Sequence, residues 1–283
     1  MAETRQIDHA AVLAILLEAA QAAGTVLVSI FAQGYEIRSK SDGSPVTEAD
    51  TAAELLILAE LHAHFPQIPI VAEEAAAAGV LPADLGQRFF LVDPLDGTRE
   101  FVSGRAEFTV NIALIEHGCP TVGVVVAPAL GHTYYGSEAG AFHVDERAGR
   151  TTRLMAVSTH DDPVAVASRS HRDPDTNAYL AHRKITNCVS VGSSLKFCLL
   201  AEGKADIYPR FSRTMEWDTA AGDAVLRAAG GRTTLADEVT PLAYGKRPEA
   251  CEDDPQGFTA AFANPPFIAF GRGRSAKPSR YDR

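Results

Sequence analysis

The stretch "LVDPLDGTREF", residues 91–101, closes a run of apolar residues with two acids three positions apart, Asp93 and Asp96. Buried strands usually end in neutral turn residues, because two carboxylates near a core repel each other unless a cation lies between them. The spacing therefore predicts that the acids end the strand at residues 88–93 and hold a cation there.

The residues around these acids suggest how the turn would work. Pro94 should bend the chain so that both acids and the Leu95 carbonyl face one cation. Gly97 and Thr98 should then open a helix, whose free N–H groups and positive dipole end suit a phosphate. One segment would thus supply metal ligands, an anion cradle and a hydroxyl group.

Further acids occur at similar places. Glu73 and Glu74 follow the apolar run "IPIVA", Asp218 follows the single tryptophan at a helix start, and Asp50 lies in the first turn of another helix. Oxygen ligands without a nearby Cys or His cluster favour magnesium or manganese over zinc. The alternative, that each acid merely caps a helix or is solvated in a loop, is weakened by their number.

The hydrophobic pattern predicts the order of the elements. Residues 7–33 have helical apolar spacing, and Thr47 with Asp50 forms a capping box that opens a second helix through residue 65. Short apolar runs bounded by turn residues predict strands in the first half. These runs lie at residues 68–72, 88–93, 108–116, 121–129, 131–137 and 140–144.

From about residue 163 the pattern alternates strand and helix, ending in a helix at residues 217–231 that Gly230 and Gly231 terminate. This order predicts an α/β fold of two closely packed lobes, each with a mixed sheet. We expect one domain over residues 1–270, with a metal-binding lobe at about 7–155 and a second lobe at about 156–270. The site should lie in the cleft between the lobes.

Composition narrows the function. The formal net charge of -10 argues against nucleic-acid binding, although a bound cation can reverse the local sign for a small phosphorylated substrate. The four scattered cysteines form no CxxC pair, which favours a reducing compartment over disulfides or zinc. The N-terminus is too polar for a signal peptide, and we expect no apolar run to span a membrane, so the sequence predicts an intracellular protein. The basic tail at residues 271–283 is expected to be disordered.

One competing motif is DxDGT, typical of aspartyl-phosphate phosphatases of the haloacid dehalogenase type. Here two residues separate the acids, as "DPLD", so they lose the same-face geometry of alternate strand positions. The motif therefore does not favour an aspartyl nucleophile.

The order Glu-Glu, then "DPLDGT", then "WD" resembles the inositol monophosphatase superfamily of magnesium-dependent, lithium-sensitive phosphatases, over residues 10–270. Several longer stretches resemble its CysQ branch, the 3'(2'),5'-bisphosphate nucleotidases: "DPLDGTREF", "EFTVNIALIEHG", "SRSH", "GSSLKFCLLAEGKADIYPRF" and "EWDTAAGDAV". The resemblance implies a layered αβαβα sugar-phosphatase fold.

Carried over position by position, the resemblance implies two or three Mg²⁺ ions and a set of ligands. The implied metal ligands are Glu73, Asp93, the Leu95 carbonyl, Asp96 and Asp218. Thr98, hydrogen-bonded to Asp50, would orient and deprotonate the attacking water, and Glu73 would share in this catalytic work. The chemistry is plausible because a hydroxyl that gives its proton to a carboxylate can accept one from water.

The substrate contacts implied by the resemblance include the metal-binding residues and a basic group. Around the reacting phosphate they are Glu73, Leu95, Asp96, Gly97, Thr98 and Asp218. Around the nucleotide and its second phosphate they are His171, Ser193, Lys196 and Arg210. Three alternatives stay open: Lys196 as a solvated helix residue, His171 as a loop histidine, and Ser193 as a helix cap.

The resemblance implies removal of the 3'-phosphate from adenosine 3',5'-bisphosphate (PAP), giving AMP and phosphate, in sulfate assimilation. The sulfated precursor PAPS, giving APS, is a further expected substrate. The alternatives are an inositol-1-phosphate phosphatase and an inactive nucleotide-binding sensor. We expect a monomer or homodimer in the cytoplasm. Peripheral attachment to the cytoplasmic face of the inner membrane is an alternative location.

Overall fold

The structure is a computed structural model that describes residues 7–34, 37–39, 45–157, 160–169, 173–246 and 261–272. His171 and the tail beyond residue 272 lie outside this range, so the expectations for them stay expectations. Cys119, Cys188 and Cys198, the cysteines within the range, form no disulfide.

Two long helices open the fold, and their starts follow from their sequences. α1, His9–Gln33, begins after Asp8, whose side chain accepts a hydrogen bond from the Ala10 N–H. α2, Glu48–His64, begins with the predicted capping box between Thr47 and Asp50. The segment before it also forms a small antiparallel pair that the sequence analysis did not predict, β1 Ile37–Ser39 and β2 Pro45–Thr47.

A seven-stranded sheet follows, in the order β3-β4-β5-β6-β7-β8-β9. The pair β3-β4 is parallel and the others are antiparallel, so the sheet is mixed, as expected. Its strands are β3 Ile70–Ala72, β4 Arg88–Asp96, β5 Thr109–Glu116, β6 Cys119–Ala127, β7 His132–Ser137, β8 Gly140–Asp145 and β9 Arg150–Leu154. Two short helices, α3 Glu73–Ala77 and α4 Thr98–Val102, leave β3 and β4 at the same end of this parallel pair.

The second half contains a five-stranded mixed sheet in the order β11-β10-β12-β14-β13. Its strands are β10 Val164–Ser168, β11 Asn187–Val191, β12 Ile207–Arg210, β13 Arg232–Leu235 and β14 Phe267–Phe270. The helices of this half are α5 Pro174–His182, α6 Leu195–Ala201 and α7 Glu216–Ala228. The sequence analysis missed β9, β13 and β14, which are short strands of five residues or fewer.

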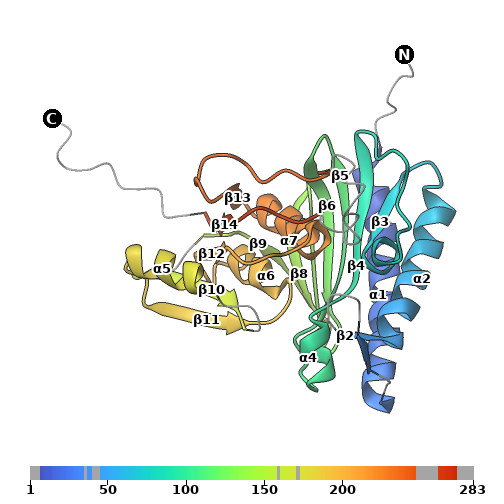
Figure 1. Cartoon of the computed structure of the whole chain (residues 1–283), viewed down its shortest axis with the longest axis horizontal. Helices are drawn as coiled ribbons and strands as arrows, with labels where there is room; N and C mark the ends of the chain where they lie inside the picture. Colours follow the sequence, from blue (N-terminus) through green and yellow to red (C-terminus); the bar gives the residue numbers. More distant parts are fainter. Residues whose placement is uncertain are drawn as a thin grey trace.

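The elements stack in five layers, as Figure 1 shows: α1 and α2, the large sheet, α6 and α7, the smaller sheet, and α5. One apolar cluster lies between the large sheet and the first two helices, and another lies between the sheets around α6 and α7. A small cluster that includes Ala165 and Leu180 joins α5 to the outer face of the smaller sheet. This is the expected αβαβα arrangement.

Helix α7 packs very closely on the large sheet because β6 contains a glycine at the contact. A Cβ atom on Gly123 would lie 2.5 Å from the Ala221 carbonyl oxygen and 2.6 Å from Ala224 Cβ. Both distances are shorter than van der Waals contact, so only glycine allows this approach. The approach fixes the position of α7, which carries Asp218.

Helix α1 corrects one expectation, since it is long and apolar enough to cross a membrane by length and composition alone. Its Val12, Leu16 and Leu27 are fully buried in the cluster against the sheet and α2. Packing within the protein therefore explains the apolar residues on the buried face of this helix.

Candidate active site

The two acids of the opening motif lie on β4, which does not end at Asp93 as predicted but continues to Asp96. Asp93 pairs with Asn111 and Asp96 pairs with Thr109, so two residues of β4, Pro94 and Leu95, lie opposite a single residue of β5. This is a β-bulge, in which an extra residue bends one strand and redirects its side chains. The bulge, and not a strand end, lets acids three positions apart share one cavity.

Gly97 connects the bulge to α4 with a left-handed backbone, at φ of 90°. A Cβ atom there would also lie 3.1 Å from the Glu107 carbonyl oxygen. Only glycine meets both conditions without strain. α4 has five residues, so its dipole is small and the expected anion cradle depends on the free N–H groups of its first turn.

Asp50 joins the start of α2 to this turn. Its Oδ2 accepts hydrogen bonds from the Thr47 N–H at 2.7 Å and the Thr47 hydroxyl at 2.8 Å. Its Oδ1 lies 3.4 Å from the Thr98 Oγ1, which also lies 3.2 Å from the Leu95 carbonyl oxygen. The Thr98 proton can therefore go to either acceptor, and one of them is the predicted Asp50 carboxylate.

Glu73 opens α3, a short helix that the sequence analysis did not predict. Ala72, the residue before the helix, has no side chain that can cap it, and Glu54 of α2 takes this role. The Glu54 carboxylate accepts hydrogen bonds from the N–H groups of Glu74 at 2.7 Å and Ala75 at 2.8 Å. No local pattern marks Glu54 as a cap, because it lies about 20 residues from the helix it caps.

Asp218 lies in the first turn of α7, as predicted. Its Oδ2 accepts a hydrogen bond of 2.8 Å from the Met215 N–H and so caps the helix. Asp218 can therefore cap the helix and bind a metal at the same time, because the cap engages only one of its carboxylate oxygens.

These segments surround one cavity of about 230 Å³ between the two sheets. It is lined by Glu73, Asp93, Leu95, Asp96, Gly97, Thr98, Ser193, Lys196, Arg210 and Asp218, which were predicted, and also by Glu100, Ser194, Tyr208 and Thr214, which were not. Asp50 is reached through Thr98. Residues far apart in the sequence therefore meet at one place.

Burial and mutual repulsion disfavour the charged form of the acids. The pKa of Asp93 lies well above its usual value because the side chain is buried and faces Glu73, Asp96 and Asp218. Burial also raises the pKa of Asp218 to about 8, with Asp96 and Glu73 adding to the effect. For Asp96, burial raises the pKa against the opposing charge of Lys196 and the hydrogen bond from Ser194. A cation among these acids would relieve this cost.

The residues fit a hard divalent cation. Asp93 Oδ2 is buried without a hydrogen-bond partner among the residues described, and the donors around the cavity are oxygens, the ligands that Mg²⁺ prefers. Within the same described part of the chain, no three His, Cys, Asp or Glu side chains already converge on one point as a finished ligand set. The acids line the cavity and would complete a coordination shell together with the Leu95 carbonyl.

Ser193 and Ser194, the two residues before α6, differ in their surroundings. Ser194, not Ser193, precedes α6, so the helix-cap reading of Ser193 is wrong. Ser193 has a positive φ of 47°, and its buried hydroxyl has no hydrogen-bond partner among the residues described. Ser194 Oγ lies 2.8 Å from Asp96 Oδ2 and 2.7 Å from the Asp218 carbonyl oxygen. Ser194 thus links the bulge to α7.

Two buried cations, Lys196 and Arg210, line the same cavity as the acids. Lys196 is 6% exposed, so its reading as a solvated helix residue is wrong. Burial lowers the pKa of Lys196 to about 8, while Asp96 acts in the opposite direction, and its ammonium contacts the Ser193 carbonyl. Arg210 is equally buried and donates to the carbonyls of Ser212 at 3.1 Å and Arg213 at 2.9 Å. The cavity is therefore lined by both acids and cations.

Comparison with known proteins agrees with this geometry. The model of the inositol monophosphatase family matches residues 8–264. The chain belongs to this family.

Relatives within the family confirm the expected CysQ branch of nucleotidases. The 3'(2'),5'-bisphosphate nucleotidase CysQ of Salmonella typhimurium is 46% identical over 213 residues, which cover 75% of this chain and 85% of the relative. The crystal structure of CysQ from Bacteroides thetaiotaomicron superimposes with a TM-score of 0.72 at 35% identity, covering 92% of this chain and 97% of the other. The Thermotoga maritima IMPase superimposes with a TM-score of 0.71 at 26% identity, covering 91% of each chain.

Proposed function

We propose that the protein is a magnesium-dependent 3'(2'),5'-bisphosphate nucleotidase that removes the 3'-phosphate of adenosine 3',5'-bisphosphate, giving AMP and phosphate. The observation that carries the proposal is that one cavity is lined both by a group of acids and by two buried cations. The acids suit cations that would bind the reacting phosphate, and Lys196 and Arg210 suit a second phosphate. The names of the CysQ relatives support the same substrate class.

Glu73, Asp93, the Leu95 carbonyl, Asp96 and Asp218 would hold two or three Mg²⁺ ions. When bound, these ions supply charge neutralisation at the phosphate and the leaving oxygen, and acidify a water molecule. The buried, mutually repelling carboxylates support this assignment, since their charges need a counterion in the folded protein.

Thr98 and Asp50 would accept the proton of the attacking water. The Thr98 hydroxyl can donate to Asp50 Oδ1, which leaves its own oxygen lone pairs for the water. Asp50 is held for this role because its other oxygen is occupied by Thr47. The pair would thus orient the water in line with the leaving group, with no phosphoenzyme.

The remaining contacts concern the nucleotide. The Ser193 hydroxyl, buried at the cavity wall, would bind the ribose or its phosphate, with Gly97 and the first turn of α4 near the reacting phosphate. His171 stays a proposed contact outside the described residues. We extend the proposal to PAPS, to a role in sulfate assimilation, to lithium inhibition, and to a cytoplasmic monomer or homodimer.

The function is tested with Lys196→Met, which keeps much of the buried volume and removes the charge. We expect a loss of about 1.5–3 kcal/mol in transition-state binding of PAP, or roughly ten- to a hundredfold in kcat/KM. Turnover of a monophosphate should change little, because it has no second phosphate for Lys196 to bind. The measurement is kcat/KM for PAP and inositol 1-phosphate in wild type and variant at fixed ionic strength.

An equal loss of kcat/KM on both substrates would show that Lys196 does not bind the second phosphate of the nucleotide. Wild-type preference for inositol 1-phosphate over PAP would favour the alternative function. Absence of any Mg²⁺-dependent phosphate release across a panel of nucleotides and sugar phosphates would contradict the enzymatic proposal as a whole.

A further inference from the structure

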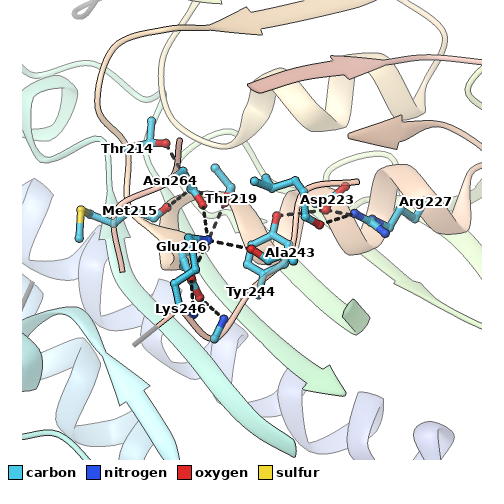
Figure 2. A network of polar contacts seen from close by, with 12 residues as sticks. Thr214, Met215, Glu216, Thr219, Asp223, Arg227, Ala243, Tyr244, Lys246 and Asn264 are labelled. Atoms are coloured by element: carbon cyan, nitrogen blue, oxygen red, sulfur yellow. Dashed lines mark hydrogen bonds and ion pairs between the residues drawn. The ribbon is translucent and has the colours of Figure 1, made fainter. Parts of the chain in front are cut away.

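Behind the cavity, the start of α7 is connected to a buried polar network that the proposed chemistry does not use (Figure 2). The network joins residues 214–219 to two segments that come later in the chain, around Lys246 and Asn264. Glu216 is fully buried and Asn264 is 7% exposed. Buried polar groups of this kind are retained only where their hydrogen bonds are well satisfied.

Asn264 holds the two carbonyls on either side of the Met215 N–H. Its backbone N–H donates to the Thr214 carbonyl at 2.8 Å, and its side-chain Nδ2 donates to the Met215 carbonyl at 2.8 Å. The Thr214 carbonyl belongs to the same planar peptide unit as the Met215 N–H, which donates to Asp218 Oδ2. The backbone N–H of residue 264 thus holds the peptide plane that donates to Asp218, and the Asn264 side chain holds the next peptide, between Met215 and Glu216, so that both sides of the Met215 residue are fixed.

Lys246 forms an ion pair with Glu216 and also contacts the Asn264 side chain. The Lys246 ammonium lies 2.7 Å from Glu216 Oε1 and 3.4 Å from Asn264 Oδ1. The Glu216 carboxylate also accepts hydrogen bonds from the N–H groups of Gly245 at 2.6 Å and Lys246 at 3.0 Å. The Lys246 contact orients the Asn264 amide, because only its oxygen can accept from the ammonium and its nitrogen must then face Met215.

We propose that Asn264, oriented by the Glu216–Lys246 pair, is a positioning residue for Asp218 and thereby sets the affinity of the cation site. The inference depends on the proposed metal site, in which Asp218 is a ligand. Groups that orient a ligand typically contribute about ten- to a hundredfold to metal affinity. Asn264 acts through the Met215 peptide and does not itself line the cavity.

The test variant is Asn264→Asp, which has nearly the same shape. The new carboxylate keeps an acceptor for Lys246, and the Thr214 hydroxyl can rotate to donate to it. The Met215 carbonyl cannot donate, so its hydrogen bond is lost. The Thr219 hydroxyl either loses its contact with residue 264 or gives up its hydrogen bond to the Glu216 carbonyl. We expect the Mg²⁺ dissociation constant, measured by calorimetry on the full chain without substrate, to rise by about tenfold or more.

The matched control is Thr233→Val, which also removes one buried hydrogen bond to α7. The Thr233 hydroxyl donates to Asp223 Oδ1 at 2.6 Å, one turn beyond Asp218 and away from the 214–216 turn. Its Mg²⁺ dissociation constant should stay within about twofold of the wild-type value, since only stability is affected. Thermal denaturation of both variants in EDTA shows whether their stabilities are comparable.

Lys246→Met is the second variant, for use if Asn264→Asp does not fold. It was chosen because the Lys246 side chain is 32% exposed. It should weaken Mg²⁺ binding by about threefold or more through loss of Asn264 orientation. Wild-type affinity in the folded variants, or an equal loss in Thr233→Val, would overturn the inference alone. A wild-type protein that binds no Mg²⁺ would overturn the proposed metal site together with it.

Discussion

Asp93 shows at the level of one residue how function conflicts with stability. Its carboxylate is buried, faces three other acids, and leaves one oxygen without a hydrogen-bond partner in the described structure. Such a group destabilises the folded protein unless a cation is bound. Packing therefore does not explain its presence, and the proposed metal site does.

The substitution Asp93→Asn separates these two effects. We expect Mg²⁺-dependent phosphate release to fall below about a tenth of the wild-type rate, because a ligand charge is lost. In EDTA, the variant should be at least as stable as the wild type at pH 7, since its amide removes a carboxylate whose pKa is raised on folding. Phosphate-release assays and thermal denaturation provide the two measurements.

Retained activity would exclude Asp93 from the metal site. A large loss of stability in EDTA would mean that the carboxylate has a structural role that its present contacts do not explain.

At the scale of elements, the site depends on helices that are capped by distant side chains. Glu54 of α2 caps α3 and so places Glu73 at the cavity. Ser194 at the start of α6 contacts Asp96 of the bulge and the Asp218 carbonyl of α7. Each link joins segments that are separate in the sequence.

The substitution Glu54→Ala tests this arrangement. We expect it to reduce the free energy of unfolding by about 1–3 kcal/mol, because two backbone N–H groups of α3 lose their acceptor. The Mg²⁺ concentration for half-maximal activity should also rise, since Glu73 is less firmly held. Urea denaturation in EDTA and Mg²⁺ titration of activity measure the two effects.

Glu60→Ala is the control on the same helix, because the Glu60 side chain is 45% exposed. It should change stability by less than about 0.5 kcal/mol. If both variants behaved alike, the capping role of Glu54 would be refuted.

For the whole molecule, the acids that line the cavity predict that cation binding increases the free energy of unfolding. A ligand at a hundred times its dissociation constant stabilises a protein by about 2.7 kcal/mol, which corresponds to about 5–10 °C in Tm for a chain of this size class. We therefore expect Mg²⁺ to raise the Tm of EDTA-treated protein by several degrees. Differential scanning calorimetry over a Mg²⁺ series provides the measurement.

Sodium chloride at matched ionic strength is the control, because the net charge of -10 also responds to general screening. An equal shift with sodium would assign the effect to screening and not to a cation site.

Local sequence determined the parts of this protein that depend on neighbours in the chain. The capping box of Thr47 and Asp50, the helix from residue 9, most strands and the acids of the opening motif could all be predicted, because helix caps and hydrophobic periodicity act within a few residues. The family resemblance added the fold and the candidate ligands on the same basis of short motifs.

The tertiary structure decided what depends on pairing between distant segments. Only the register of β4 against β5 shows that the acids lie at a bulge, and only packing shows that Lys196 is buried. Glu54, Ser194 and Asn264 have no local signal, since the groups they bind lie 20 to 98 residues away. Hydrogen bonds of this kind form only after the layers have assembled, because the hydrophobic contacts that bring the segments together are themselves non-local.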